Sequence, residues 1–202
     1  VDFRSYATRK NPGGAAEAFR MAFGNRPDDG EVLVVKTLGA DRRPDDYRRF
    51  IESVQDLGNR LVVIDRSLAD AEIKGLLCGC NAFISLHRSE GFGRGIAEAM
   101  YYGKPTIATA YSGNMDFCTS ETCALIDYKL VPVKKGEYPF WHDQVWANPN
   151  LEEAAHWMQR LAADPLLSAS MGKRAQQEIR ASHGAAVVGQ QMRARLVNLG
   201  LI

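Results

Sequence analysis

The sequence lacks the features that mark several large classes of protein. Among its 202 residues, no apolar run approaches the ~20 residues that a membrane-spanning helix needs, and no signal peptide is visible. The formal net charge is only +1, so no overall field points to nucleic acid as a partner. There is no internal repeat and no low-complexity tract. What remains, with 46% hydrophobic residues, is the composition of an ordinary globular protein with a core.

Cysteine is scarce and is not spaced for metal binding. The four cysteines are Cys78, Cys80, Cys118 and Cys123. None forms the C-x-x-C pair of a zinc site, and no histidine lies at ligand spacing beside them. We therefore expect free cysteines that pack as small hydrophobes, in a reducing and hence cytoplasmic compartment.

Short apolar runs alternate with helical patterns through the first two thirds of the chain. Strands are expected at residues 31–37, 61–65, 82–86, 106–109 and 123–126, and the near-continuous hydrophobicity of these runs indicates strands covered on both faces. The chain also begins at what resembles the end of a strand, which suggests a piece of something longer. The pattern predicts an α/β fold: a Rossmann-like, doubly wound parallel sheet of six strands.

Helices are expected between and after these strands. They are predicted at about residues 12–23, 47–57, 69–78 and 96–100, and then at 151–163, 165–182 and 185–199. Asn11, Asn150 and Asp164 are expected to cap three of them, and Gly58 to end the second. Between the two groups lies an extended stretch, 129–146, which carries several aromatic residues.

The most informative segment is a glycine-rich stretch between the expected strand 82–86 and the helix that follows it. It contains Gly91, Gly93 and Gly95, which let the backbone turn tightly and approach a ligand. The free N–H groups of the following helix suit a phosphate. Glu90 precedes the glycines and Glu98 follows eight residues later, so two acids flank an anion-binding turn. They could hold hydroxyl-bearing groups on either side of a diphosphate, which is the outline of a sugar nucleotide.

Two other interpretations of these glycines remain open. A dinucleotide-binding fingerprint has the spacing G-x-G-x-x-G after the first strand of a domain, but here position 96 is Ile96 and the preceding strand is a late one. Alternatively, the glycines serve only as a turn, because glycine is the default residue in tight turns.

The segment resembles glycosyltransferase family 4, a group of retaining, nucleotide-sugar-dependent enzymes with the GT-B fold. The matching residues are Glu90-Gly91-Phe92-Gly93, Glu98-Ala99-Met100, Gly103-Lys104-Pro105 and the apolar strand Thr106-Ile107-Ala108. The resemblance extends over nearly the whole chain. It implies that residues 1–202 form the donor-binding, C-terminal half of such an enzyme. Residues 183–202 would be a terminal helix that contacts an N-terminal acceptor domain absent from this sequence.

The resemblance also implies roles for individual residues. Glu90 would contact the transferred hexose as the catalytic residue, and Glu98 would bind the ribose. Ile64 and Leu68 would pack against the base. The diphosphate would be bound by Arg4, Lys10, Gly91, Phe92, Gly93 and Arg94.

Some of these assignments leave alternatives. Arg4 and Lys10 lie in a basic loop before an expected helix, where cations suit a diphosphate, but Arg9 competes with Arg4 because the family's arginine commonly follows a glycine. Arg94 replaces an apolar residue of the family. It would either add a donor near the phosphates or point to solvent.

Further polar and aromatic residues have no assigned role. Asn114 and Asp116 could meet the sugar, although their loop departs from the family pattern and Ser112 is more simply a helix cap. His87 could act in acid–base chemistry or be a satisfied, positioning histidine, and the role of Arg88 is open. The aromatic residues of the extended stretch, Tyr138, Phe140, Trp141 and Trp146, would form an acceptor platform or, more simply, pin the loop to the domain.

The resemblance implies transfer of a hexose, with retention, from a UDP or GDP sugar to a glycan or lipid-linked acceptor in polysaccharide biosynthesis. The nucleotide sugar would be the substrate, no cofactor or metal is expected, and no Asp-x-Asp metal motif occurs. We expect a cytoplasmic parent enzyme that associates peripherally with the inner face of the membrane, and a chain that transfers no sugar by itself. The alternatives are a nucleotide-sugar epimerase of the same fold, for which only His87 and Glu90 offer an acid–base pair, and a non-catalytic nucleotide-sugar-binding module.

Overall fold

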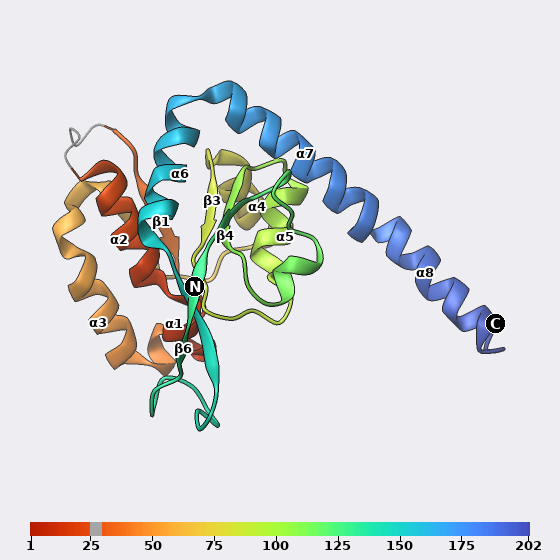
Figure 1. The fold of residues 1–202 in the computed structure, drawn as a ribbon, viewed down its shortest axis with the longest axis horizontal. Coiled ribbons are helices and arrows are strands. Elements are labelled where there is room, and N and C mark those ends of the chain that lie inside the picture. Colours follow the sequence, from red (N-terminus) through yellow and green to blue (C-terminus); the bar gives the residue numbers. More distant parts are fainter. Residues whose placement is uncertain (25–29) are drawn as a thin grey trace.

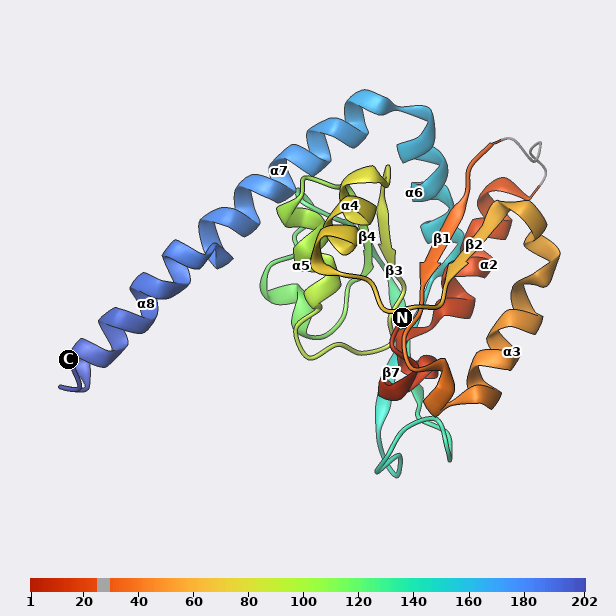
Figure 2. The same ribbon diagram turned by 180° about the vertical axis from the view of Figure 1, so that it is seen from behind.

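A computed structural model describes residues 1–24 and 30–202. Figure 1 shows an α/β body from which the last two helices extend to one side, and Figure 2 shows the same ribbon from behind. The helices are α1 (Ala7–Lys10), α2 (Pro12–Phe23), α3 (Pro44–Val54), α4 (Asp70–Gly79), α5 (Arg94–Tyr101), α6 (Leu151–Ala163), α7 (Pro165–His183) and α8 (Ala185–Asn198). The strands are β1 (Leu33–Lys36), β2 (Leu61–Ile64), β3 (Phe83–Ser85), β4 (Thr106–Thr109), β5 (Ala124–Ile126), β6 (Tyr128–Pro132) and β7 (Val145–Pro149).

The α/β class and the parallel strand pairing agree with the prediction, but a single six-stranded sheet is not confirmed. Within the described residues, β1 pairs with β2 and β4 pairs with both β3 and β5, all in parallel, while β6 and β7 form an antiparallel pair. An isolated bridge joins Asp2, at the start of the chain, to Leu38, which lies just after β1. This bridge does not involve β3, β4 or β5, so the two parallel sheets remain separate within the described residues.

Side chains of the central sheet alternate between two hydrophobic clusters. In β4, Ile107 packs in the cluster that includes α2 and α6, while Ala108 packs in the cluster that includes α5 and α7. In β5, Ala124 and Ile126 join the first cluster and Leu125 contacts the second. Because successive residues of a strand point to opposite faces, this sheet is covered on both sides, as its hydrophobic runs predict.

The sheet of β1 and β2 is covered on one face only, which contradicts the prediction for these strands. Leu33 and Val35 are buried, whereas Val34 is 42% exposed and Val62 is 43% exposed. Helix α4 follows β2 but contains no buried residue, so its side chains do not close the open face. The apolar run of a strand indicates that the strand is buried, but it does not show whether helices cover one face of its sheet or both.

The stretch expected to be merely extended forms most of the β6–β7 hairpin. Its strands pair from Tyr128 with Pro149 to Pro132 with Val145. The amide of Ala147 donates to the carbonyl of Arg88 at 2.9 Å, which fastens the hairpin to the loop after β3. Trp146 is buried and packs the hairpin against the domain, as one of the two predicted roles requires, while Phe140 is 92% exposed.

Local signals placed most helix ends correctly. The side-chain oxygens of Asn11, Asn150 and Asp164 accept hydrogen bonds from the first turns of α2, α6 and α7, as capping residues do. Helix α3 differs, because it ends at Val54 and a 3-10 segment continues over Gln55–Arg60. Gly58 lies inside that 3-10 segment with a φ of 52°, so it follows the end of α3 and does not itself end the helix.

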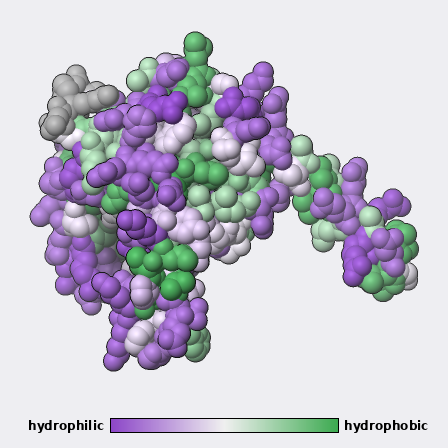
Figure 3. Space-filling model, viewed as in Figure 1, coloured by the Kyte–Doolittle hydropathy of each residue, from purple (hydrophilic) through white to green (hydrophobic). Residues whose placement is uncertain are grey.

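Helix α8 projects away from the body (Figures 1 and 2) and contains no buried residue. Figure 3 shows hydrophobic and hydrophilic residues side by side on it. Met192 is 63% exposed and Leu199 is 52% exposed, so this helix leaves apolar side chains uncovered. None of the helices in the described ranges is long and apolar enough to cross a membrane.

Candidate functional site

Residues 89–95, which we call the glycine loop, connect β3 to the amino end of α5. Gly93 occupies the position before the helix with a φ of 89°, a conformation that favours glycine, and no side chain caps this end. A Cβ atom at Gly95 would lie 3.2 Å from the ring of Phe83, so the loop also packs tightly against β3. The uncapped amino end of α5 therefore presents free N–H groups, which suit an anion.

The loop after β4 holds the glycine loop in place. The amide of Gly113 donates to the carbonyl of Glu90 at 3.0 Å, and the amide of Glu90 donates to the hydroxyl of Ser112 at 2.8 Å. Ser112 makes no capping hydrogen bond, which corrects its predicted role as a helix cap. Its hydroxyl is used instead to support the residue that was expected to be catalytic.

Glu90 forms ion pairs with two cations from the start of the chain. Its carboxylate lies 3.3 Å from the guanidinium of Arg9 and accepts a hydrogen bond from the ammonium of Lys10. The Glu90 side chain is only 11% exposed. Burial works against ionisation, but the hydrogen bond and charge of Lys10 and the charge of Arg9 outweigh it, so the pKa of Glu90 lies below its usual value.

The structure brings Arg9, and not Arg4, to this site. The guanidinium of Arg9 also donates to the carbonyl of Ser89 at 2.7 Å, so it contacts the glycine loop directly. Arg4 lies on the surface, 54% exposed, and pairs with Asp2 at 3.0 Å. Both arginines are in the basic loop that the sequence analysis singled out, but Arg9 is the one beside Glu90.

His87 is fully buried in a hydrogen-bond network. Its Nε2 lies 3.1 Å from the carbonyl of Tyr111 and 3.0 Å from the amide oxygen of Asn114. Both are acceptors, so Nε2 carries a proton, while Nδ1 lies 3.1 Å from the hydroxyl and 3.2 Å from the carbonyl of Ser85. Burial lowers the pKa of His87, with the hydrogen bond to Tyr111 opposing it, which favours a neutral ring.

This network decides between the two interpretations of His87. A buried ring with both nitrogens engaged positions the loop after β4, and it does not offer a free acid or base. The acid–base pair needed for the epimerase alternative is therefore not available in this arrangement. Asn114 is also buried, and its amide donates to the carbonyl of Thr109 at 3.0 Å, so neither end of its side chain is free for a sugar.

Arg88 links three parts of the site. Its amide donates to the carbonyl of Arg9 at 2.8 Å and its carbonyl accepts from the hairpin. The guanidinium lies 5.4 Å from the centre of the Trp146 ring, and its buried Nε atom has no hydrogen-bond partner within the described residues. Burial lowers the pKa of Arg88, with the charge of Glu137 acting in the opposite direction.

Glu98, Arg94 and Phe92 line a small cavity of about 180 Å³ between α5 and α7. Arg94 is 88% exposed and its guanidinium lies 3.5 Å from the Glu98 carboxylate. The Phe92 ring contacts the rings of Phe117 and His183, at centroid distances of 5.0 and 5.7 Å. Arg94 thus points to solvent, one of its two predicted alternatives, and Glu98 is half-exposed and accessible to a ligand.

The residues expected to bind the base lie at the end of β2. The carbonyl of Ile64 accepts from the Thr37 amide at 3.0 Å, within the pairing of the first parallel sheet. Leu68 lies half-buried in the loop before α4. Asp116 is exposed in the loop after β4. The base assignment and a sugar role for Asp116 remain predictions.

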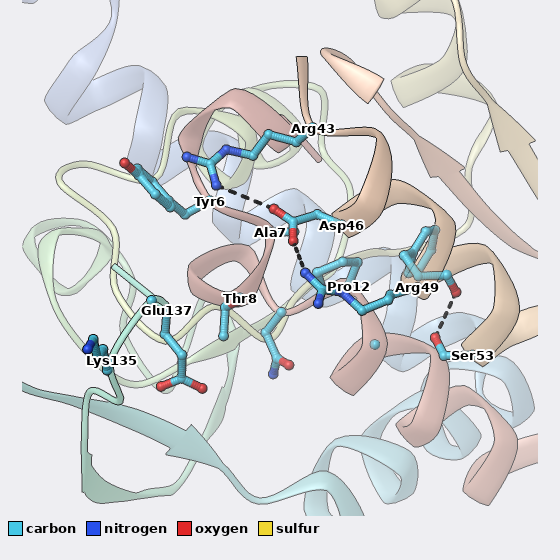
Figure 4. Close-up of a pocket in the computed structure, with 14 residues that line it drawn as sticks. Tyr6, Ala7, Thr8, Pro12, Arg43, Asp46, Arg49, Ser53, Lys135 and Glu137 are labelled. Atoms are coloured by element: carbon cyan, nitrogen blue, oxygen red, sulfur yellow. Dashed lines mark hydrogen bonds and ion pairs between the residues drawn. The ribbon is translucent and has the colours of Figure 1, made fainter. Parts of the chain in front are cut away.

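A second cavity, of about 560 Å³, was not anticipated from the sequence (Figure 4). It lies among the amino ends of α2 and α3 and the loop that joins β6 to β7, and we call it the α2–α3 cavity. Tyr6 lies at its wall, with the Arg43 guanidinium 4.1 Å from the ring centre and the Tyr138 ring 5.0 Å away. The only sequence signal for it was the concentration of aromatic residues in the stretch 129–146.

Metal ligands are not clustered in the described part of the chain, where no group of three His, Cys, Asp or Glu side chains could hold an ion. Cys118 and Cys123 are buried and free, and Cys78 is exposed. The charged groups that meet at the site are Glu90, Arg9 and Lys10, beside the amides of the glycine loop.

Comparison with known proteins adds two findings. The family model described as Glycosyl transferases group 1 matches residues 6–128, which include the basic loop, the glycine loop and α5. The comparison with curated protein sequences gave no match.

Solved structures share the fold at low sequence identity. HepE of Anabaena, in complex with UDP and glucose, is 21% identical with a TM-score of 0.68, and the match covers 94% of this chain and 45% of that one. Sucrose-phosphate synthase from Thermosynechococcus elongatus is 20% identical with a TM-score of 0.68, covering 95% of this chain and 42% of that one. A glycosyltransferase from Rickettsia africae ESF-5 is 17% identical with a TM-score of 0.67, covering 95% and 46%. The chain thus spans about half the length of these structures.

Proposed function

Since the chain belongs to the group 1 glycosyl transferases, we propose that it is the donor-binding half of a retaining hexosyltransferase of glycosyltransferase family 4. The observation that carries the proposal is the meeting of Arg9, Lys10 and Glu90 beside the uncapped amino end of α5. Two cations and a helix amino end favour a diphosphate, while a carboxylate beside them suits sugar hydroxyls. A nucleoside diphosphate sugar carries both groups next to each other.

The residues divide the work of binding and transfer. Lys10, Arg9 and the amides of the glycine loop hold the diphosphate, whose negative charge increases as the bond to the sugar breaks. Cations and backbone dipoles positioned where charge develops are a major source of catalysis. Glu90 orients the hexose through its hydroxyl groups, and Glu98 binds the ribose. The structure of HepE in complex with UDP-glucose supports a UDP sugar as the first donor to test.

The ion pairs of Glu90 imply a change of partners when the donor binds. The diphosphate draws Lys10 and Arg9 toward its oxygens, and Glu90 exchanges part of its contact with these cations for sugar hydroxyls. This exchange couples capture of the diphosphate to positioning of the sugar. Transfer to a glycan or lipid-linked acceptor is completed by a second domain, which would lie in the half of the related structures that this chain does not cover.

Isothermal calorimetry of the chain with UDP, GDP, ADP and their glucose conjugates tests the donor assignment. We expect weak binding of at least one nucleoside diphosphate, reduced at least tenfold in Lys10→Ala and unchanged in Lys129→Ala. Lys129 is a suitable control because it is an exposed lysine of β6, away from the glycine loop. Absence of binding by all of these nucleotides, or equal losses in the two lysine variants, would remove the donor proposal.

A further inference from the structure

The α2–α3 cavity adjoins the Glu90 site without belonging to it. Its wall includes Asn11, the residue that follows Lys10, but neither Glu90 nor any residue of the glycine loop. Its volume of about 560 Å³ lies within the range of roughly 300–1,000 Å³ that is typical of small-molecule sites. The cavity shares no lining residue with the smaller one beside Glu98.

Polar side chains of several kinds line the cavity. One oxygen of Glu137 accepts from the amide of Lys134 at 2.7 Å, which leaves its other oxygen for a ligand. Thr8 and Lys135 are exposed residues of the same lining and add a hydroxyl and an ammonium group. Figure 4 shows the Glu137 carboxylate and the Thr8 side chain directed toward the same part of the cavity. Donors and acceptors are therefore offered together, which suits a ligand rich in hydroxyl groups.

The charges around the cavity argue against a phosphate. Asp46 lies between two arginines, 3.5 Å from the Arg43 guanidinium and hydrogen-bonded to that of Arg49 (Figure 4). Both arginines are thus engaged by a carboxylate, and Glu137 adds a second negative charge to a lining that holds three cations and two carboxylates. A phosphate would meet arginines already paired with Asp46 and would also face the Glu137 carboxylate.

Apolar surface and backbone strain complete the site. Phe50 and Pro12 are buried residues that line the cavity beside the polar groups. Tyr6 and Asn11 both have positive φ, 65° and 51°, in a region that bulky residues such as tyrosine rarely adopt. Such strain tends to cluster at ligand-binding sites. Apolar surface beside hydroxyl, carboxylate and ammonium groups matches a sugar ring with its apolar faces and polar edge.

We propose that the α2–α3 cavity binds a neutral sugar residue of a glycan acceptor, as a subsite separate from the donor site. The inference rests on the proposed function, since it gives the acceptor its chemical class. A glycan that occupies this cavity and reaches past Lys10 would be held on the donor-binding half of the enzyme. The cavity would then help to select glycans over lipid-linked single sugars.

A cavity-filling variant gives the sharpest test. A Cβ atom at Gly13 would meet no atom within 4 Å, so Gly13→Leu fills the cavity without a direct clash, and leucine favours the helix more than glycine does. Gly75→Leu is the matched control, because Gly75 is a helical glycine of α4 with equally open space and no part in the cavity. The probes are maltotriose, cellotriose and mannotriose, titrated into the ¹⁵N-labelled chain and followed by NMR.

We expect at least one trisaccharide to shift the amide signals of Thr8 and Glu137 in the wild type and in Gly75→Leu, with at least tenfold weaker binding in Gly13→Leu. Thr8→Val and Glu137→Gln should weaken binding without filling space. No shift with any trisaccharide, or equal shifts with inorganic phosphate, would overturn the inference. A parallel UDP titration separates the two proposals: UDP binding without sugar binding removes only the subsite. Sugar binding in the cavity without nucleotide binding would contradict only the proposal of a donor site.

Discussion

The guanidinium of Arg9 lies 3.3 Å from the carboxylate of Glu90, although 81 residues separate them in the sequence. The contact joins the basic loop before α2 to the glycine loop before α5. Both loops lie at one edge of the parallel strands, where ligands bind in doubly wound folds. The Arg9–Glu90 pair lies beside the amino end of α5, so this helix end and the cations Arg9 and Lys10 meet at one site. The predictions below depend on that arrangement.

The first prediction distinguishes the three cations of the basic loop. Arg9→Ala and Lys10→Ala should each weaken a nucleoside diphosphate by about 1.5–3 kcal/mol, the usual contribution of a hydrogen bond to a charged group. The bare nucleoside should be almost unaffected, because it has no phosphate. Arg4→Ala, whose cation pairs with Asp2 on the surface, should resemble the wild type in the same calorimetric titrations. A loss in Arg4→Ala as large as in Arg9→Ala would restore the assignment of Arg4 to the diphosphate.

Glu98→Ala should weaken every nucleotide that binds, whatever its base. The variant removes the acceptor proposed for the ribose hydroxyls, and the loss should be about 1.5–3 kcal/mol. Glu52→Ala is the control, because Glu52 is an exposed glutamate of α3 outside both cavities. Calorimetry showing equal affinity for UDP in Glu98→Ala and in the wild type would exclude the ribose role.

Glu90→Ala should affect turnover far more than binding of the free diphosphate. Free UDP carries no hexose, so Glu90 has nothing to orient in that complex, whereas misplacement of the sugar can slow transfer by ~100-fold. The measurement is turnover with a UDP sugar in the two-domain enzyme, set beside the affinity for UDP. Unchanged turnover in Glu90→Ala would contradict the sugar role, and complete loss of UDP binding would assign Glu90 to the diphosphate instead.

Acid should destabilise the fold through His87. Burial lowers the pKa of its ring in the folded state, whereas an unfolded histidine titrates near its ordinary value of about 6.5. The neutral ring therefore contributes stability above about pH 6.5, and this contribution is lost as the pH falls toward the lower folded pKa. Chemical unfolding at a series of pH values should show the decline, and a His87→Asn variant should lack it. The same decline in the variant would show that another group is responsible.

Gly113→Ala should disturb the glycine loop from the opposite side. A Cβ atom at Gly113 would lie 2.0 Å from the carbonyl oxygen of Gly91, so the backbone of one loop must move. We expect a loss of about 1–3 kcal/mol of stability, as in other overpacked sites, and weaker binding of UDP. Gly75→Ala, with open space around its Cβ, should keep wild-type affinity and stability. Normal UDP binding by Gly113→Ala would show that the position of the loop does not matter for the donor.

The sequence by itself predicted most of the secondary structure and singled out the segment around which the candidate site is built. Asn11, Asn150 and Asp164 cap helices because a side-chain oxygen next to a helical pattern acts within one turn. The glycine loop was recognisable because its chemistry is carried by consecutive residues. Runs such as 106–109 were recognisable as strands because short apolar runs between helical patterns are typical of buried strands in α/β folds.

Contacts between distant segments were decided only by the tertiary structure. The choice of Arg9 over Arg4, the hydrogen bond from Glu90 to Ser112 and the burial of His87 each depend on how loops from different strands meet. The α2–α3 cavity arises where two helices and the hairpin leave space. The open face of β1 and β2 has the same origin, because a strand's own residues do not say whether a helix will cover it. Helix caps and tight turns depend on interactions between residues a few positions apart, whereas these features depend on the packing of elements far apart in the chain.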